Sequence, residues 1–244
     1  MIKKILFKNI VFSNLNHSDF NKIINKKGYF TFPSGPGLAS INISKDYLFS
    51  LQKSDLVFFD SGFFVILLKI LKGIKVNKFS GYKFIDFFLK YLKKNRKKII
   101  LSIDPNKNFS NSNKNYLKKI GVKNIINFVA PKYNQKKIRD AKLVQLANKI
   151  KPHFILNNIG GGTQEILGLY LKKNIKFKTT ILCTGGAISF FTGDQAPINS
   201  LIDRLYLGWL VRLIFNPFVF FKRYLVALRL IPLVLFNKVE IKND

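Results

Sequence analysis

The sequence predicts an α/β fold in which a mostly parallel sheet carries helices on both faces, followed by a helical appendage at the C-terminus. Short apolar runs alternate with amphipathic segments along most of the chain, which is typical of βα units. One apolar run leads into three consecutive glycines and a helix-like segment. The last part of the chain is unusually apolar and basic. For 244 residues we therefore expect one domain over 1–200 and an appendage over 201–244.

Strand and helix signals alternate in the first half of the chain. The predicted elements are, in order, a strand at 5–7, a helix at 18–25, a strand at 29–32, a helix ending near 51, a strand at 55–60 and a helix at 63–71. The second strand breaks at PSGPG, because proline and glycine interrupt regular structure. The third strand, DLVFFD, ends in Asp60, and strand ends are where α/β sheets keep their sites.

The alternation continues in the second half. The predicted elements are a helix at 82–92, a strand at 98–103, a short helix at 116–120, a strand at 124–128, a helix at 135–150, and strands near Phe154 and Thr180. Residues 106–115 have the composition of a low-complexity segment. No internal repeat is present, and the alternation of these elements predicts a parallel sheet with helices on both faces.

The stretch 153–169, HFILNNIGGGTQEILGL, predicts a strand, a tight turn and a helix. Gly160, Gly161 and Gly162 lack the Cβ atoms that would keep a ligand from the backbone, and a helix starting near Thr163 directs free N–H groups into the same space. An anion such as a diphosphate fits there. A purely structural turn is an equally good interpretation. The spacing matches neither a dinucleotide-binding motif nor a P-loop.

The charge of the chain is extreme. It holds 42 Lys and Arg against 12 Asp and Glu, a net charge of +30, which predicts attraction to the phosphates of nucleic acids, anionic lipids or nucleotides. The hydrophobic fraction of 48% favours a protein that touches a membrane over a purely nucleic-acid-binding one. A coding bias toward Lys, Asn, Ile and Phe would also raise the charge, without any function.

Compartment signals point to the cytoplasm. The single cysteine, Cys183, excludes a disulfide framework and indicates a reducing environment. The first residues, MIKKILFKNIVF, lack a long apolar core and a cleavage site, so they predict a strand and not a signal peptide. No window reaches the roughly 18 uninterrupted apolar residues of a membrane-spanning helix. We therefore expect a cytoplasmic protein.

Few carboxylates are candidates for a general base. Asp60 and Asp104 each end an apolar strand, and Glu165 and Asp194 lie beside glycine-rich turns. For Asp60 and Asp104 the alternative role is the N-cap of the following helix. The chain has no Asp-x-Asp motif and only two His and one Cys, so we expect no metal and no other cofactor. Cations or helix dipoles would then have to stabilise a departing diphosphate.

The segment from Leu201 is apolar almost throughout, with recurring cations. Arg204, Arg212 and Arg223 fall within about a third of a helical wheel, although Pro217 must interrupt or bend such a helix. One interpretation is a buried helix pair whose cations extend to solvent. We favour an interfacial appendage with aromatic side chains among lipid headgroups, because little polar surface is left for water.

Several motifs carry a family resemblance. CTGGAISFFTGDQAP, followed by LIDRLYLGWLVRLIFNPFVFFKRYL, and the glycine loop GGGTQE with its Gln164 and Glu165 resemble sequences of the WecG/TagA/CpsF family of bacterial glycosyltransferases. The strand DLVFFD matches an apolar strand of that family and places Asp60 at its proposed catalytic aspartate. Thr31 matches a threonine at the preceding strand end. The resemblance spans roughly 29–225 and is most specific in the C-terminal block.

The resemblance implies a Rossmann-like, nucleotide-sugar-binding catalytic domain over 1–200 and a membrane-binding appendage over 201–244. The implied reaction moves a hexose from a UDP-sugar donor to a polyprenyl-diphosphate-linked saccharide acceptor, as in N-acetylmannosaminyltransferases. It is inverting, metal-independent and part of surface polysaccharide biosynthesis. The protein would then be peripheral on the anionic inner face of the plasma membrane, with no nucleic acid as a partner.

The matched positions give an implied site. Asp60 accepts a proton from the acceptor hydroxyl, with Thr31 as the second catalytic residue. Arg212 and Arg223 neutralise the departing UDP, and Arg204 is a third candidate. The implied donor-binding residues are Gly160, Gly161, Gly162, Gln164, Glu165, Gly185 and Gly186.

Some positions depart from the family pattern. Pro33, Lys83, Ser189 and Gly208 stand where the family has Asn, Asp, Asp and Glu, so donor sugar, acceptor sugar and linkage stay open. Two other classes also stay open. A catalytically inactive, membrane-associated family member would explain the departures. A basic nucleic-acid-binding protein would explain the charge but leave the apolar tail unexplained.

Overall fold

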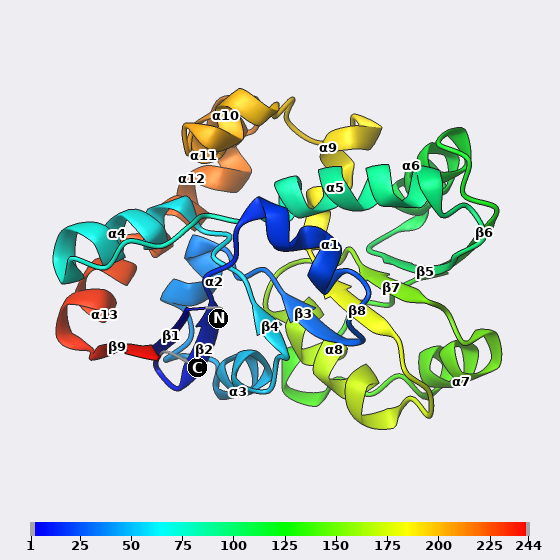
Figure 1. The fold of residues 1–244 in the computed structure, drawn as a ribbon, viewed down its shortest axis with the longest axis horizontal. Helices are drawn as coiled ribbons and strands as arrows, with labels where there is room; N and C mark the ends of the chain where they lie inside the picture. The colour runs from blue at the N-terminus through cyan, green and yellow to red at the C-terminus, as the bar shows by residue number, and fades with distance from the viewer. Residues whose placement is uncertain (1–2, 243–244) are drawn as a thin grey trace.

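The computed structural model describes residues 3–242, apart from the side chain of residue 136, and these residues form one nine-stranded sheet (Figure 1). The strands are β1 (Lys4–Phe7), β2 (Ile10–Ser13), β3 (Gly28–Thr31), β4 (Leu56–Val57), β5 (Ile99–Asp104), β6 (Asn124–Val129), β7 (Phe154–Asn157), β8 (Thr180–Cys183) and β9 (Val239–Lys242). Their order is β6-β5-β7-β8-β3-β4-β2-β1-β9. Only β1 runs antiparallel to its neighbours, β2 and β9, so the predicted mostly parallel α/β sheet is confirmed.

Helices and short 3₁₀ turns connect the strands. They are η1 (His17–Asp19), α1 (Phe20–Ile23), α2 (Gly35–Ala39), α3 (Lys45–Gln52), α4 (Gly62–Lys72), α5 (Gly81–Lys94), α6 (Lys107–Lys119), η2 (Gln135–Lys137), α7 (Ala141–Ile150), α8 (Thr163–Asn174), η3 (Gly185–Ala187), α9 (Ser189–Thr192), α10 (Ser200–Arg204), α11 (Gly208–Phe215), α12 (Pro217–Ala227) and α13 (Leu230–Phe236). Most follow a strand of the parallel part, as βα units require.

Both faces of the sheet are covered. Successive strand residues point to opposite faces, so Phe154 of β7 packs against Phe88 of α5, with ring centroids 4.9 Å apart, while its neighbour Ile155 packs with Leu143 of α7 on the other face. Figure 1 shows α5 and α6 on one side of β5 and β7, and α7 and α8 on the other. The prediction of helices on both faces is therefore confirmed.

The structure adds a strand that the sequence analysis does not predict. β2 forms a hairpin with β1 through a two-residue turn in which Lys8 and Asn9 have positive φ angles of 53° and 59°. Positive φ at both positions defines a type I′ turn, whose twist suits paired strands. Lysine is uncommon in this region of φ, which explains why the sequence carries little hairpin signal.

The helix predicted at 116–120 is much longer in the structure. Residues 107–115, which the sequence analysis describes only by their low-complexity composition, form most of α6. The side chain of Asn106 caps this helix by accepting a hydrogen bond from the Phe109 N–H group at 3.1 Å. Ser110 and Asn113 face the sheet and are buried, so polar residues occupy positions where a periodicity analysis looks for apolar ones.

A buried carboxylate explains these inward polar groups. Asp104, at the end of β5, accepts hydrogen bonds at Oδ1 from Ser102 Oγ (2.9 Å), Asn113 Nδ2 (2.7 Å) and Asn158 Nδ2 (2.8 Å), and at Oδ2 from Asn127 Nδ2 (3.0 Å). The network joins the ends of β5, β6 and β7 to α6. Asp104 is therefore a structural residue, not an N-cap.

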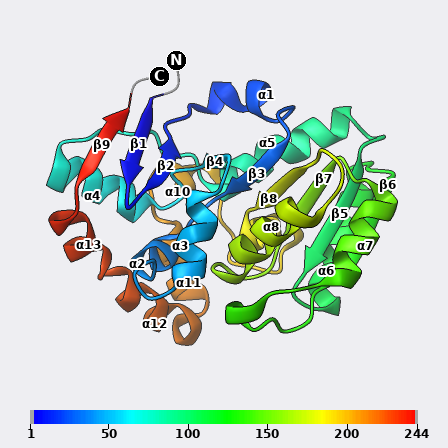
Figure 2. The same ribbon diagram turned by 90° about the horizontal axis from the view of Figure 1, so that it is seen from below.

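The C-terminal segment returns to the sheet. After helices α10 to α13, β9 pairs with β1 in the register Lys4↔Lys242 (Figure 2), whereas a helical appendage is predicted through 201–244. Leu230 and Val234 of α13 are fully buried against β1, β2 and α4. By contrast, Phe218 is 91% and Ile214 is 74% exposed. Among residues 3–242, no helix is long and apolar enough to cross a bilayer.

Asp104→Asn tests the buried network. The change places one amide NH₂ group among three others, so we expect the free energy of unfolding to fall by about 2–4 kcal/mol. Urea denaturation followed by circular dichroism measures it. The exposed change Asp46→Asn on α3 is the control and should stay within about 0.5 kcal/mol of the wild type. Equal stability of the two variants would contradict the structural role of Asp104.

Candidate active site

Two adjoining cavities open beyond the carboxyl ends of the neighbouring strands β7, β8, β3 and β4. The aromatic cavity, of about 290 Å³, has among its lining residues Phe63, Tyr82, Tyr206, Trp209 and Tyr224. The glycine-loop cavity, of about 250 Å³, has among its lining residues Gly160, Gly161, Gly185, Gly186 and Arg223. The two share Ser34, Asp60, Tyr82 and Arg212. The carboxylate of Asp60 thus lies where the cavities meet.

Asp60 is held by the start of helix α5. The Gly81 N–H group donates to Asp60 Oδ1 at 2.7 Å, and among the described residues no group hydrogen-bonds to Oδ2. Ser61, not Asp60, caps α4, because its hydroxyl accepts from the Phe64 N–H group at 3.2 Å. Burial raises the pKa of Asp60 to about 6, and the Gly81 hydrogen bond and the charge of Arg212 oppose this rise. The N-cap interpretation of Asp60 is wrong.

The glycine loop leaves open space in front of helix α8. A Cβ atom at Gly160 or Gly161 would meet nothing within 4 Å, and Gly162 has a φ of 86°, which favours glycine. The Gly162 N–H group donates to Glu165 Oε2 at 2.6 Å, which closes the first turn of α8. Burial raises the pKa of Glu165 to about 7. An anion bound in front of α8 would therefore favour the neutral form of this carboxyl group, since a negative charge on Glu165 would repel it.

Gln164 ties this loop to the second glycine pair. Its Nε2 donates to Glu165 Oε1 at 2.9 Å, and its Oε1 accepts from the Gly185 N–H group at 2.6 Å. Gly185 has a φ of 57°, and a side chain at Gly186 would overlap Gln195. The structure therefore brings six of the seven predicted donor-site residues to the lining of one cavity, where Gln164 and Glu165 are buried and brace the backbone, while Gly162 adjoins it at the start of α8 without lining it.

Two of the three predicted arginines reach this site from the tail. The Arg212 guanidinium lies over the Phe190 ring at 4.8 Å, and its buried Nε atom has no hydrogen-bond partner in the described part of the chain. Arg223 lines the glycine-loop cavity while much of its side chain stays exposed, and partial desolvation and the like charge of Arg212 lower its pKa. Arg204 is exposed and lines neither cavity.

Thr31, the other predicted catalytic residue, lies apart from the cavities. It is fully buried at the end of β3, and its hydroxyl donates to Ser54 Oγ at 3.1 Å. Its side chain lines neither cavity. This position suits a residue that supports the strand end rather than one that touches a ligand.

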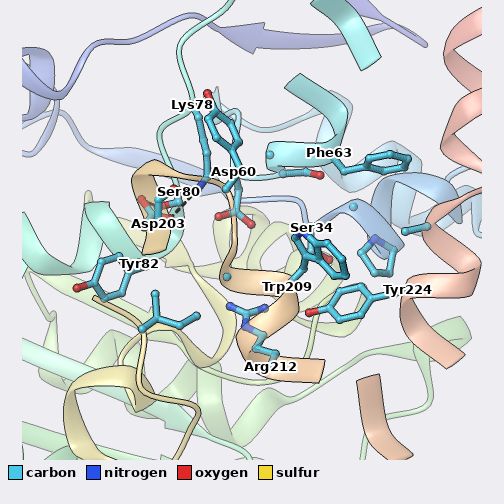
Figure 3. A pocket seen from close by; sticks show the side chains of 18 of the residues that line it. Ser34, Asp60, Phe63, Lys78, Ser80, Tyr82, Asp203, Trp209, Arg212 and Tyr224 are labelled. Atoms are coloured by element: carbon cyan, nitrogen blue, oxygen red, sulfur yellow. Dashed lines mark hydrogen bonds and ion pairs between the residues drawn. The ribbon is translucent and has the colours of Figure 1, made fainter. Parts of the chain in front are cut away.

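The sequence analysis misses most of the aromatic cavity. Trp209 and Tyr224 come from α11 and α12, and Tyr206 from the turn between α10 and α11, in the tail whose aromatic rings are predicted to face lipid. Lys78 and Asp203 also line the cavity and form an ion pair of 2.7 Å, although Asp203 lies in a segment without a site signal. Figure 3 shows Asp60, Arg212 and Tyr224 directed toward one space. Only the fold brings these distant segments together.

Tyr206 closes one side of the aromatic cavity. Its φ of 63° is unusual for a bulky residue, and its ring covers Gly62, where any side chain would overlap it. Strain of this kind persists only where the surroundings fix the residue, and it gathers at functional sites. In the described part of the chain, no group of three or more His, Cys, Asp or Glu side chains is arranged to hold a metal ion.

The arrangement has a definite chemical capacity. Asp60 has a pKa close to neutral and one open oxygen, so it is suited to accept a proton near pH 7. Arg212 and Arg223 lie with the N-terminus of α8 around the glycine-loop cavity, where they favour an anion. A reaction that releases a proton on one side and an anionic group on the other would use both features.

Asp60→Asn tests the cost of burying this carboxylate. Its pKa is about 6 in the folded state against 3.8 as the ordinary value, so ionisation destabilises the native state as pH rises from about 4 to 6. The Asn variant does not ionise, and we expect it to be more stable than the wild type by about 2–3 kcal/mol at pH 7. The difference should vanish near pH 4. Urea unfolding across this range measures it, and a difference that does not change with pH would contradict the buried, ionised state.

Comparison with known proteins identifies one family. No curated protein matches the chain. The model of the family described as the glycosyl transferase WecG/TagA/CpsF family matches residues 5–244, a range that holds both cavities and the tail arginines. The match covers nearly the whole chain and agrees with the motifs of the sequence. The chain therefore belongs to the glycosyl transferase WecG/TagA/CpsF family.

Proposed function

We propose that this protein transfers a hexose, with inversion, from a UDP-sugar to a saccharide carried on polyprenyl diphosphate. The observation that carries the proposal is the place of Asp60, whose carboxylate lies at the junction of two cavities of different character. A transferase needs one site for the donor and one for the acceptor, with a base between them. The product would be an intermediate of surface polysaccharide biosynthesis.

The glycine-loop cavity is the proposed donor site. Gly160 and Gly161 leave room for a diphosphate to approach the backbone, and the positive end of the α8 helix dipole lies beside this space. Arg212 and Arg223 supply two positive charges to the same space. Because these groups are fixed before any ligand binds, little reorganisation opposes the binding of UDP.

The aromatic cavity is the proposed acceptor site. Trp209 is half exposed and Leu228 is 52% exposed, so the cavity borders the apolar surface of the tail helices. Aromatic rings provide flat apolar faces for sugar rings and isoprenoid chains alike. Tyr224 Oη is buried here without a hydrogen-bond partner among the described residues. A polar group of the saccharide acceptor would supply the missing hydrogen bond.

The proposed reaction is a displacement across the junction. The acceptor oxygen bonds to the anomeric carbon while the bond from that carbon to the β-phosphate oxygen of UDP breaks. Asp60 takes the proton of the acceptor hydroxyl, and Arg212 and Arg223 offset the charge that develops on UDP. Entry from one cavity and departure into the other would favour attack opposite the leaving group, hence inversion.

Membrane association at the cytoplasmic face is part of the proposal. The tail helices expose large apolar side chains, and those more than half exposed on α11 and α12 are Ile214, Phe215, Phe218, Phe221 and Leu225. Lys222 and Arg229 are exposed on the same segment, where they are suited to anionic headgroups. An acceptor on a polyprenyl carrier requires this kind of surface contact.

The departures from the family pattern lie in different places. Ser189 and Gly208 line the cavities, so they bear on substrate choice, while Lys83 pairs with Asp86 at 3.1 Å. The donor sugar therefore stays open, and N-acetylmannosamine is one candidate. An inactive family member is the second candidate function. What favours it is that Ser189 and Gly208 carry no carboxylate where the family has Asp and Glu.

UDP binding tests the donor site. We expect saturable binding of UDP in a calorimetric titration with a metal chelator present, and weaker binding by Arg223→Ala, because one phosphate charge loses its partner. Asp60→Asn should bind UDP at least as tightly as the wild type, while turnover falls about 10²–10⁴-fold. Asp46→Asn is the matched control. A DNA duplex that binds where UDP gives no heat would contradict the proposal, as would unchanged turnover in Asp60→Asn.

Vesicle binding tests the tail surface. Ile214→Ser with Phe218→Ser removes two exposed apolar side chains that line neither cavity. We expect co-sedimentation with anionic vesicles to fall about tenfold or more, with UDP binding unchanged. Ile43→Ser is the control, since Ile43 is 69% exposed but lies before α3, outside the tail.

Point substitutions are preferable to deletion from residue 201. Deletion would remove β9 and the buried Leu230 and Val234, so loss of binding would report loss of the core. Undiminished vesicle binding by the double Ser variant would contradict membrane contact through α11 and α12.

A further inference from the structure

Lys78 lies between two carboxylates and is bonded to only one of them. Its ammonium group donates to Asp203 Oδ1 at 2.7 Å and to the Asp203 main-chain oxygen at 2.6 Å. The second carboxylate oxygen of Asp203 accepts from Ser80 Oγ at 2.9 Å. The side chains of Lys78 and Asp203 are only 12% and 15% exposed. Figure 3 shows Lys78 extending between Asp60 and Asp203, with its ion pair directed to Asp203.

The start of helix α5 holds both carboxylates. Ser80 caps this helix and donates to Asp203, while the next N–H group, that of Gly81, donates to Asp60. Asp60 therefore keeps one oxygen bonded and one open, whereas both oxygens of Asp203 are bonded. The Tyr206 ring adds a cation–π contact to the Lys78 ammonium at 4.9 Å.

We propose that Asp203 is a positioning residue that holds the Lys78 ammonium group away from Asp60 and so keeps Asp60 Oδ2 open to the acceptor hydroxyl. This inference rests on the proposed role of Asp60 as the base. An ammonium group bonded to Oδ2 would occupy the oxygen that must receive the proton, and it would make that oxygen a weaker base.

The charges around Asp60 agree with this competition. Arg212 and Lys78 lower the pKa of Asp60, while Asp203 raises it. Glu165 and Tyr47 also interact electrostatically with Asp60, and His17 does so with both Lys78 and Asp203. Lys78 is thus close enough to act on Asp60, yet it bonds to Asp203, which offers two acceptor atoms and is fixed by Ser80.

A simpler role for Asp203 makes a different prediction. If its ion pair with Lys78 only fastened α10 to the turn before α5, loss of either partner would lower turnover equally. The double variant would then be no more active than either single variant. If Asp203 instead restrains Lys78, Asp203→Asn alone releases an ammonium group onto Asp60. Adding Lys78→Met then removes the released group and restores the open oxygen. The two roles are separated by a double-mutant cycle.

The first readout is the titration of the Asp60 carboxyl carbon by NMR in full-length protein, assigned with Asp60→Asn. We expect Asp203→Asn to lower the Asp60 pKa by about one unit or more when Lys78 is present. In the Lys78→Met background the same change should lower it by less than half as much, since only the repulsion by Asp203 is lost. Ser80→Ala should give a smaller shift in the same direction as Asp203→Asn.

The matched control is Asp86→Asn, which breaks the Lys83 and Lys90 pairs (3.1 and 3.0 Å) on the same helix but lines neither cavity. It should leave the Asp60 pKa unchanged. Equal shifts caused by Asp203→Asn in the two backgrounds would overturn the proposal. Ser80→Ala provides a second measure should Asp203→Asn fail to fold.

The second readout is turnover. We expect Asp203→Asn to reduce kcat about tenfold or more with little change in KM for the donor, and Lys78→Met to recover most of that loss in the double variant. Equal impairment of both single variants and of the double variant would overturn the positioning role. If the NMR shifts appear as expected but no variant, nor the wild type, transfers sugar, the positioning stands and the proposed function fails.

Discussion

The site depends on how the protein keeps one carboxylate ionisable after burying it. Desolvation alone would drive Asp60 to its neutral form, and its pKa is about 6 because one short hydrogen bond from Gly81 and the charges of Arg212 and Lys78 oppose that effect. The outcome is a group that is largely ionised at neutral pH and still basic enough to accept a proton. A stronger set of partners would make a poorer base, and a weaker set would leave the group protonated.

The fold assembles these partners from distant parts of the chain. β4 leads to Asp60, the start of α5 supplies Gly81, and the tail supplies Arg212 and Arg223. The tail is fixed in two ways, since α13 buries Leu230 and Val234 and β9 pairs with β1. The exposed helices α11 and α12 are therefore anchored to the core through α13 and β9. The tail that lines the site also forms the apolar surface that is proposed to contact the membrane.

The sequence was informative where chemistry and local pattern coincide. The predicted strand at 55–60 is shortened to β4 at Leu56–Val57, with Asp60 three residues beyond its end, and the three glycines before α8 are where expected, because strand ends and glycine turns have local signatures. The type I′ hairpin at Lys8 and Asn9 lacks such a signature, since neither residue is glycine. The first part of α6 has no apolar periodicity, because its inward-facing residues are polar and Asn113 bonds to Asp104.

Residues that act through tertiary contacts could not be predicted. Arg204 and Arg212 lie close together on a helical wheel drawn for one continuous helix. The chain bends between α10 and α11, where Tyr206 has a positive φ, so the two side chains do not share a face in the structure. Thr31 lies at the end of β3 as predicted, yet its hydroxyl donates a hydrogen bond to Ser54 and does not line either cavity. Asp203 has no distinguishing neighbours in the sequence, and only the approach of α10 to the turn before α5 gives it a lysine and a serine as partners.

The most direct test of this account is a crystal structure of the protein with UDP bound. The account predicts the diphosphate in the glycine-loop cavity, between the start of α8 and the guanidinium groups of Arg212 and Arg223, with the aromatic cavity still free beside Asp60. UDP in the aromatic cavity, or bound only to lysines on the outer surface, would contradict the division of the site into donor and acceptor sides.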